Sequence, residues 1–296
     1  MKKELDFTAY LAVFVVMLFW SSGLPVIALG LKVESPFAFL LIRFTISSIL
    51  IFLYAVIRKA KLLFSPKTFC HLFFNSLFVF SQFIFFYHGL KTTAAQRSNI
   101  IINLNPVIII LFAHFFFKDE RLTKSKLFGT ALAFVGVFYL FFEKNLITSQ
   151  SLTGDFMILC AAISIACSTL YTRYLCNRVN LIALLFWQIF FSTIVVFFIM
   201  KLGGIDFGTF SKIGKLLHIY LYLSVFTNII APLLWFWLIS HYKLSKIAVI
   251  SFVFPVMSAL FCYMILNEPL SPKLWFSLFL VTLGISIVQW KKDKTL

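Results

Sequence analysis

Long polar segments are missing from this sequence, and charged side chains are scarce. Charged residues make up 12% of the chain, whereas hydrophobic residues make up 61% and the mean hydropathy is +1.00. A soluble domain of this size needs more polar surface than that. Apolar runs of about eighteen or more residues recur along the whole chain, so we expect nearly all of it to lie in a membrane.

Paired cysteines and catalytic motifs are also missing. The five cysteines are odd in number and form no CxxC pair, so neither a disulfide framework nor a zinc site is predicted. No HExxH helix or Ser-His arrangement suggests an enzyme. We therefore expect no catalytic residues, no bound metal and no cofactor. The net charge of +16 comes from basic residues in short connections, where they set topology and contact anionic lipid. The lipid bilayer is thus an expected partner, and nucleic acid is not.

The apolar pattern predicts an all-α, polytopic membrane protein with ten transmembrane helices. Three Ser-Pro pairs mark helix starts, because the hydroxyl can cap a helix whose first residue is proline; these are Ser35-Pro36, Ser65-Pro66 and Ser271-Pro272. The expected spans are 7–31, 35–57, 68–90, 97–117, 126–142, 154–175, 181–200, 216–240, 246–266 and 273–290.

The basic residues predict the orientation of these spans. With the N-terminus inside, 17 of the 26 Lys and Arg residues fall on the inner side and 8 on the outer side, which leaves Arg43 inside a span. Cytoplasmic connections carry an excess of Lys and Arg. We therefore expect both termini in the cytoplasm and the protein in the cell (inner) membrane.

The chain also resembles itself. Asn105-Pro106, Glu120 and Gly136 in the first half match Phe254-Pro255, Glu268 and Gly284 in the second, and each glutamate lies 16 residues before its glycine. The prolines would bend their helices as hinges, the glutamates would accept amide hydrogen bonds at the start of the following helix, and the glycines would allow close helix packing.

The repeat predicts two units, residues 1–148 and 149–296, of five helices each. Because five is odd, consecutive units must be inverted relative to each other. Inverted repeats place a binding site near the midplane, where the two halves meet, and permit access from either side in turn.

These motifs resemble the EamA family of the drug/metabolite transporter superfamily. The resemblance rests on the stretch from Leu18 to Gly23, Ser35-Pro36 and Arg43-Phe44, the two repeat copies, and Gly154-Asp155 at the start of the second copy. It covers essentially the whole chain and implies ten helices in two inverted halves around a central cavity. Similar members move amino acids, other metabolites and drugs.

Polar and aromatic side chains inside the spans are the candidate substrate contacts. Arg43 would suit a carboxylate, although it could instead snorkel or brace helix ends. Asn99 and Asn103 share one helical face, and the amides could alternatively join helices. Trp235 and Trp237 are two apart, so we expect at least one of them to pack. The candidates are Trp20, Arg43, Gln82, Asn99, Asn103, Trp187, Gln188, Asn228 and Trp235.

The ten acidic residues fall in tails, in loops or at span ends in this interpretation, with Asp155 at a span end and Arg97 in an outer loop. That pattern argues against proton coupling through a buried acid and favours an exchanger, a facilitator or a histidine-based relay.

The best-supported function is a carrier for a small organic metabolite, such as an amino acid or a related amphipathic compound, working by alternating access. A membrane enzyme such as a lipid or acyl transferase, a channel, and a drug efflux carrier of the same fold are the alternatives. The sequence leaves open the substrate, the direction, the coupling and the oligomeric state, including a homodimer.

Overall fold

The computed structural model describes residues 6–116, 124–140, 149–176, 178–205, 210–242 and 253–290. These residues form helices and connections, with no strand among them. The helices are α1 (Phe7–Val33), α2 (Pro36–Ile57), α3 (Pro66–Thr92), α4 (Ala95–Ile102), α5 (Asn105–Phe116), α6 (Lys124–Leu140), α7 (Ser149–Leu175), α8 (Leu181–Leu202), α9 (Phe210–Tyr222), the π-helix η2 (Leu223–Ile230), α10 (Ala231–His241), α12 (Val253–Leu266) and α13 (Pro272–Trp290).

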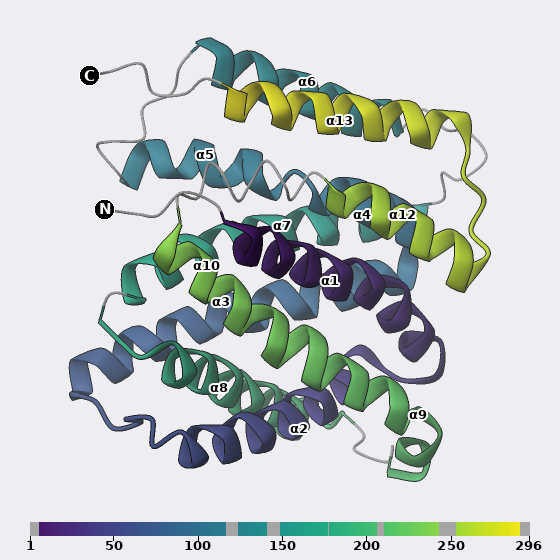
Figure 1. Ribbon diagram of the computed structural model, residues 1–296. Coiled ribbons are helices and arrows are strands. Elements are labelled where there is room, and N and C mark those ends of the chain that lie inside the picture. Colours follow the sequence, from purple (N-terminus) through teal and green to yellow (C-terminus); the bar gives the residue numbers. More distant parts are fainter. Residues whose placement is uncertain are drawn as a thin grey trace, which may run out of the picture.

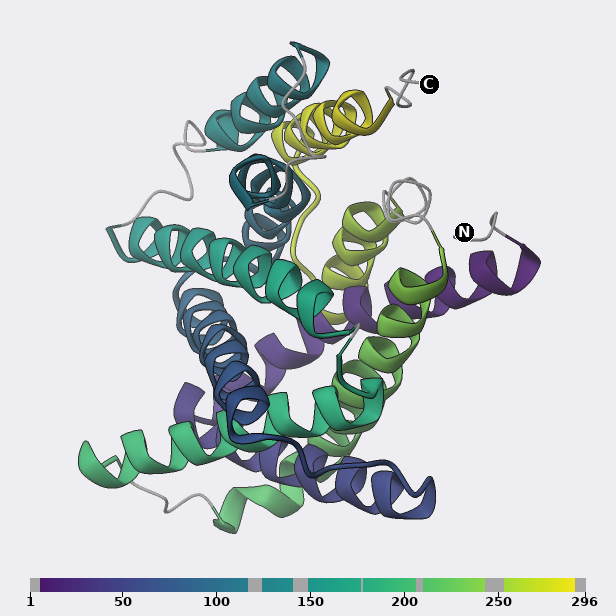
Figure 2. The same ribbon diagram turned by 90° about the vertical axis from the view of Figure 1, so that its left-hand side faces the viewer.

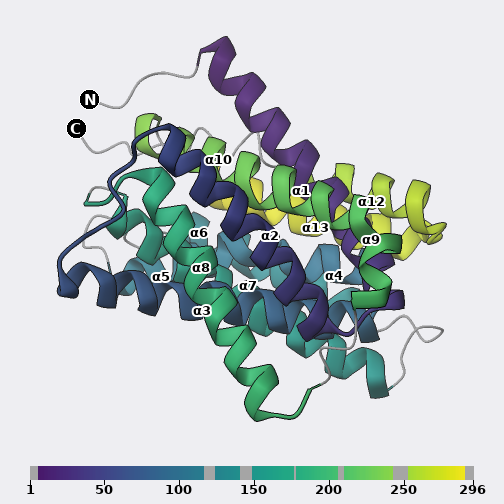
Figure 3. The same cartoon turned by 90° about the horizontal axis from the view of Figure 1, so that it is seen from below.

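The helices stack into a bundle with one pair at each edge (Figure 1). Helices α6 and α13 lie side by side at the top, and α2 packs against α8 at the bottom, with α1, α3, α7 and α10 between them. The side view in Figure 2 keeps the α6–α13 pair apart from the lower helices, and the view from below in Figure 3 shows α2 and α8 in front. Each half of the chain therefore contributes one helix to each edge pair.

Six helical segments of the described chain are long and apolar enough to cross a bilayer. They are Phe7–Val33, Pro36–Ile57, Pro66–Thr92, Ser151–Leu175, Leu181–Leu202 and Gly214–His241, and shorter apolar helices cover Leu127–Gly136, Phe254–Leu266 and Pro272–Gly284. The large hydrophobic side chains Phe7, Ile57, Leu63 and Leu202 are each more than three quarters exposed. Such apolar exposure suits a protein surrounded by lipid.

The predicted helix starts are confirmed by their capping bonds. The hydroxyl oxygens of Ser35, Ser65 and Ser271 accept hydrogen bonds from amides three residues later, at 3.3, 3.4 and 3.1 Å. In each case proline occupies the first helical position, where its missing N–H costs nothing.

One predicted span is interrupted, and another contains a π-helical segment. The span predicted over 97–117 is two helices, α4 and α5, which separate at Asn103 and Leu104 just before Pro106. The prediction of one bent helix was therefore wrong in that the helix breaks. The span predicted over 216–240 contains the π-helix η2 between α9 and α10. A ninth span was predicted to begin at residue 246. Residues 246–252 lie outside the described residues, and the described part of this span is α12, which begins at Val253.

The two repeat glycines pack α6 against α13, as their spacing predicts. A Cβ atom added at Gly136 would lie 2.9 Å from the Leu280 side chain, and one at Gly284 would lie 2.5 Å from the Gly129 carbonyl oxygen. Only a residue without a side chain permits this backbone approach. The equivalent glycines of the two repeat copies thus bring together the final helix of each half.

Candidate functional site

Arg43 lies at the centre of the candidate site. It projects from α2 and is 1% exposed. Its guanidinium group donates hydrogen bonds to the hydroxyls of Tyr87 and Thr227 and to the side-chain oxygen of Asn228. It also lies over the Phe83 ring, 5.1 Å from the centroid. Every one of these partners is neutral, and the Arg43 Nε hydrogen lacks an acceptor among the described residues.

The π-helix η2 supplies two of these partners. Thr227 and Asn228 both belong to it, and the hydroxyl of Ser224 in the same segment donates to the Arg43 carbonyl at 3.0 Å. Asn228 also donates to the Ser47 hydroxyl at 3.0 Å, one turn beyond Arg43 on α2. A π-helical turn is wider than an α-turn and is found frequently at functional sites. Here three of its polar residues contact one helix of the other half.

The tryptophans Trp20 and Trp235 border this cluster. The Trp20 indole donates to the Thr227 carbonyl at 3.3 Å, and the rings of Trp20 and Trp235 lie 5.5 Å apart. Trp237 instead packs on the rings of His241 and Tyr242, as expected for at least one of these two tryptophans of α10. The structure therefore brings together four of the candidates, Trp20, Arg43, Asn228 and Trp235.

The amides Asn99 and Asn103 form a separate contact between the halves. Asn99 donates to the Pro255 carbonyl at 2.8 Å, and the Asn103 amide donates to the Asn99 side-chain oxygen at 3.1 Å. The expected shared face of α4 is confirmed, and Asn99 joins α4 to α12, which is the helix-joining alternative. The side chain of Pro106 lies outside the described residues, although the α4–α5 break immediately before it fits a hinge position.

The remaining candidates lie away from the Arg43 cluster. Trp187 donates to the Leu62 carbonyl at 2.9 Å and packs on Phe69 near the α2–α3 connection. Gln188 donates to the Thr172 hydroxyl at 2.9 Å and so links α8 to α7. Gln82 is half-buried on α3, and within the described chain no hydrogen bond joins it to the Arg43 cluster. Sequence spacing could not reveal these differences, because they depend on how neighbouring helices are rotated.

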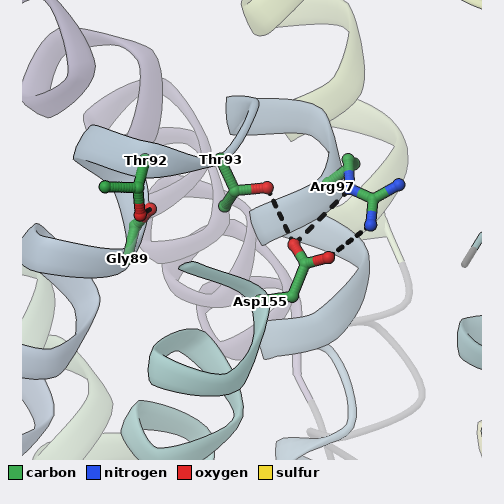
Figure 4. A network of polar contacts seen from close by, with 5 residues as sticks. All are labelled: Gly89, Thr92, Thr93, Arg97 and Asp155. Atoms are coloured by element: carbon green, nitrogen blue, oxygen red, sulfur yellow. Dashed lines mark hydrogen bonds and ion pairs between the residues drawn. The ribbon is translucent and has the colours of Figure 1, made fainter. Parts of the chain in front are cut away.

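A second buried polar network joins α3, α4 and α7 (Figure 4). Arg97 forms an ion pair with Asp155, and the Thr93 hydroxyl donates to the same carboxylate at 2.7 Å. Both charged residues are 2% exposed. Their predicted places in an outer loop and at a span end were wrong, because α7 begins five residues earlier than expected and buries Asp155. Close contact between Gly89 and Gly154 holds the two backbones together beside the pair.

Glu268 has a different role from the predicted one. Its carboxylate accepts the backbone amides of Ala95 and Gln96 at 3.0 and 2.9 Å, and so it caps α4 in the other half. The predicted cap on its own following helix is made instead by Ser271. Helix α4 has no side-chain cap from its own N-cap residue, so the distant glutamate satisfies those amides and complements the helix dipole. Glu120, its repeat counterpart, lies outside the described residues.

Tyr87 and Thr227 complete the shell around Arg43 and were not among the predicted residues. Thr227 could have been found, because it is adjacent to the candidate Asn228. Tyr87 is one of ten tyrosines, and no spacing distinguishes it from the others. The arrangement as a whole is a buried cation held by neutral groups, which can bind an anion without competition from an internal carboxylate.

Comparison with known proteins assigns this chain to a family. The sequence profile of the EamA-like transporter family matches residues 7–142 and 152–290. The chain belongs to this family. EamA-like proteins are polytopic membrane proteins, so this chain is an integral, multi-pass membrane protein and a transporter by family.

Individual relatives agree with that assignment. An uncharacterized transporter of Archaeoglobus fulgidus is 25% identical over 93% of this chain and 96% of its own length, and the uncharacterized transporter YoaV of Bacillus subtilis is 20% identical over 93% and 94%. A probable amino-acid metabolite efflux pump of Escherichia coli is 25% identical over 72% of this chain and 75% of its own length. A solved structure described as "Crystal structure of protein" shares the fold, with a TM-score of 0.70, 19% identity and coverage of 95% and 96%.

Proposed function

We propose that this EamA-like protein is a carrier for a small organic metabolite that has a carboxylate, such as an amino acid or a related amphipathic compound. The observation that carries the proposal is the environment of Arg43, a buried cation whose described partners are all neutral. Burying a charge without a counter-charge is costly. A substrate carboxylate would supply the missing negative charge and accept the free Nε hydrogen.

The mechanism we propose is alternating access between two inverted five-helix units, 1–148 and 149–296. Three contacts support it. Helix α6 packs on α13, and α2 packs on α8. Each pair joins equivalent helices of the two halves, as expected if a twofold pseudosymmetry relates them. Asn99 of one half bonds the carbonyl of Pro255 in the other. The helix break near Pro106 and the π-helical turn of η2 are irregular positions where transmembrane helices can line a polar site.

We further propose that the protein lies in the cell (inner) membrane with both termini in the cytoplasm. The excess of basic residues on the proposed inner side supports this orientation. In Figure 1 the beginning of α1 and the end of α13 lie on the same side of the bundle, as an even number of crossings requires. Single cysteines introduced at positions 121 and 273 should be labelled from opposite sides of the membrane. Labelling of both from the same side would contradict the inverted arrangement of the two units.

Counterflow in proteoliposomes tests the function. Vesicles loaded with an unlabelled amino acid should accumulate the labelled one, because a carrier exchanges solute across the bilayer whereas a channel or an enzyme does not. Arg43→Lys and Arg43→Gln should each lower this exchange at least tenfold. The lysine variant loses the planar, two-pronged guanidinium, and the glutamine variant loses the positive charge as well. Arg178→Gln, which removes an exposed arginine, is the matched control and should retain exchange. If cationic drugs were exchanged while carboxylates were not, the substrate class proposed here would be wrong.

A further inference from the structure

Glu34 is a buried carboxylate at the turn between α1 and α2. It is 4% exposed, and its Oε1 atom accepts the backbone amide of Ser35 at 2.9 Å. Its other oxygen, Oε2, has no hydrogen-bond partner in the described chain. Unpaired carboxylate oxygens are expensive to bury, since a carboxylate can accept several hydrogen bonds. This acid therefore has an unfilled binding capacity inside the protein.

Tyr220 on α9 is the neighbouring group with the same property. Its side chain is fully buried, and its hydroxyl has no partner among the described residues. Its ring lies 4.9 Å from the ring of Phe39, which follows Glu34 by five residues in the chain. The free Glu34 Oε2 atom and the Tyr220 hydroxyl would both be completed by a group that donates hydrogen bonds to each of them.

Aromatic rings connect this pair to Arg43. The Phe39 ring lies 4.9 Å from the Tyr220 ring and 5.7 Å from the Tyr87 ring, and Tyr87 accepts a hydrogen bond from Arg43. Phe39 and Arg43 are four residues apart on α2 and so share one face. The face of α2 turned to the core thus has an anion at one end, aromatic rings in the middle and a cation at the other end.

The separation of the two charges selects a class of ligand. From Ser35 to Arg43 the axis of α2 rises about 12 Å. The carboxylate and ammonium on one α-carbon are too close together to reach both groups. A carboxylate and an ammonium separated by several methylene groups, as at the two ends of lysine, have the required length.

We propose that Glu34 and Tyr220 form a subsite for the side-chain ammonium of a diamino acid whose carboxylate binds Arg43. This inference rests on the proposed function, because it assigns Arg43 to the substrate carboxylate. The ammonium has three donors and can satisfy Glu34 Oε2 and the Tyr220 hydroxyl together. The rings of Phe39, Tyr87 and Tyr220 can enclose the methylene chain and stabilise the cation.

Thermal-shift titration of the detergent-purified full chain tests the subsite, because a specific ligand raises the melting temperature. The probes are lysine, norleucine and Nε-acetyl-lysine, which share the carboxylate but differ in the distal charge. The unmodified protein should bind lysine at least tenfold more tightly than the two uncharged analogues. Glu34→Gln should abolish that preference while norleucine binding remains, and Tyr220→Phe should reduce it several-fold. Asp6→Asn removes an exposed carboxylate and is the matched control.

The outcomes separate this inference from the proposed function. If norleucine and lysine bind equally to the unmodified protein, or if the preference for lysine survives both Glu34→Gln and Tyr220→Phe, the subsite is wrong and the carboxylate carrier stands. If no carboxylate ligand raises the melting temperature of the unmodified protein, both proposals fail. Should Glu34→Gln not fold, Tyr220→Phe and the three probes on the unmodified protein still decide the matter.

Discussion

Arg97 on α4 and Asp155 on α7 form an ion pair in the interior of the bundle, and the Thr93 hydroxyl donates to the same carboxylate. The pair joins two helices that belong to different halves of the chain. Its members differ from Arg43 in that each compensates the other's charge. Their contribution is therefore to packing and orientation, whereas Arg43 is the cation that we propose binds the substrate.

Breaking this pair from one side should destabilise the protein strongly. Asp155→Asn or Arg97→Gln leaves one charge buried without its partner, which costs about 3–5 kcal/mol. The double variant should be more stable than either single variant, because no uncompensated charge remains. Melting temperatures in detergent check this order. Single variants that melt together with the unmodified protein would show that the pair is solvated and not buried.

Adding a methyl group at Gly284 should separate α6 from α13. In Gly284→Ala the new Cβ would lie 2.5 Å from the Gly129 oxygen and 2.6 Å from the Ala133 nitrogen, and these backbone atoms cannot move without shifting the helix. We expect a loss of about 1–3 kcal/mol, seen as a lower melting temperature. Gly214→Ala is the control, because nothing lies within 4 Å of its added Cβ. Equal melting temperatures for the two variants would contradict this contact.

Removing the Glu268 carboxylate should weaken the start of α4. Glu268→Ala leaves the amides of Ala95 and Gln96 without their acceptors and should cost about 0.5–2 kcal/mol, as loss of a helix cap does. Hydrogen exchange measured by mass spectrometry should increase at the beginning of α4. Lys273→Ala, which changes an exposed residue of the same region, should leave that exchange unchanged. Unaltered protection in Glu268→Ala would rule out the cap.

Cys176, just after α7, should react slowly with alkylating reagents near neutral pH. Burial raises the pKa of its thiol to about 11, and only the thiolate reacts. The thiol therefore stays mostly neutral as the pH rises. Its alkylation rate should increase about tenfold per pH unit over pH 8–10, whereas the alkylation rate of an ordinary thiol levels off above about pH 8.5. Iodoacetamide labelling of a variant that retains Cys176 alone measures this. A plateau near pH 9 would show an unperturbed thiol.

The sequence predicted the parts of the fold that local chemistry controls. Ser35 and Ser271 cap their helices because a hydroxyl before a proline needs no distant partner. Gly136 and Gly284 were identified as packing positions because they recur at matched spacing, and they do pack α6 on α13. The family assignment follows from the same ensemble of motifs.

The sequence could not predict contacts that depend on the rotation of one helix against another. Trp187 and Gln188 qualified as candidates by residue type alone, yet α8 turns them toward Leu62 and Thr172. Arg97 was assigned to a loop because its partner Asp155 is 58 residues away and their pairing leaves no local pattern. The π-helix around Thr227 likewise has no composition that distinguishes it from an α-helix.

The cap on α4 has a consequence for biosynthesis. Ala95 and Glu268 are separated by 173 residues, so the amide meets its acceptor only after the ribosome has added most of the second half. At roughly 5–20 residues per second, that interval lasts on the order of 10–30 s. During this time the nascent first half holds an uncapped helix end. The start of α4 therefore reaches its final form only when the connection between α12 and α13 has been made, and a chain truncated before Glu268 would keep this helix end uncapped.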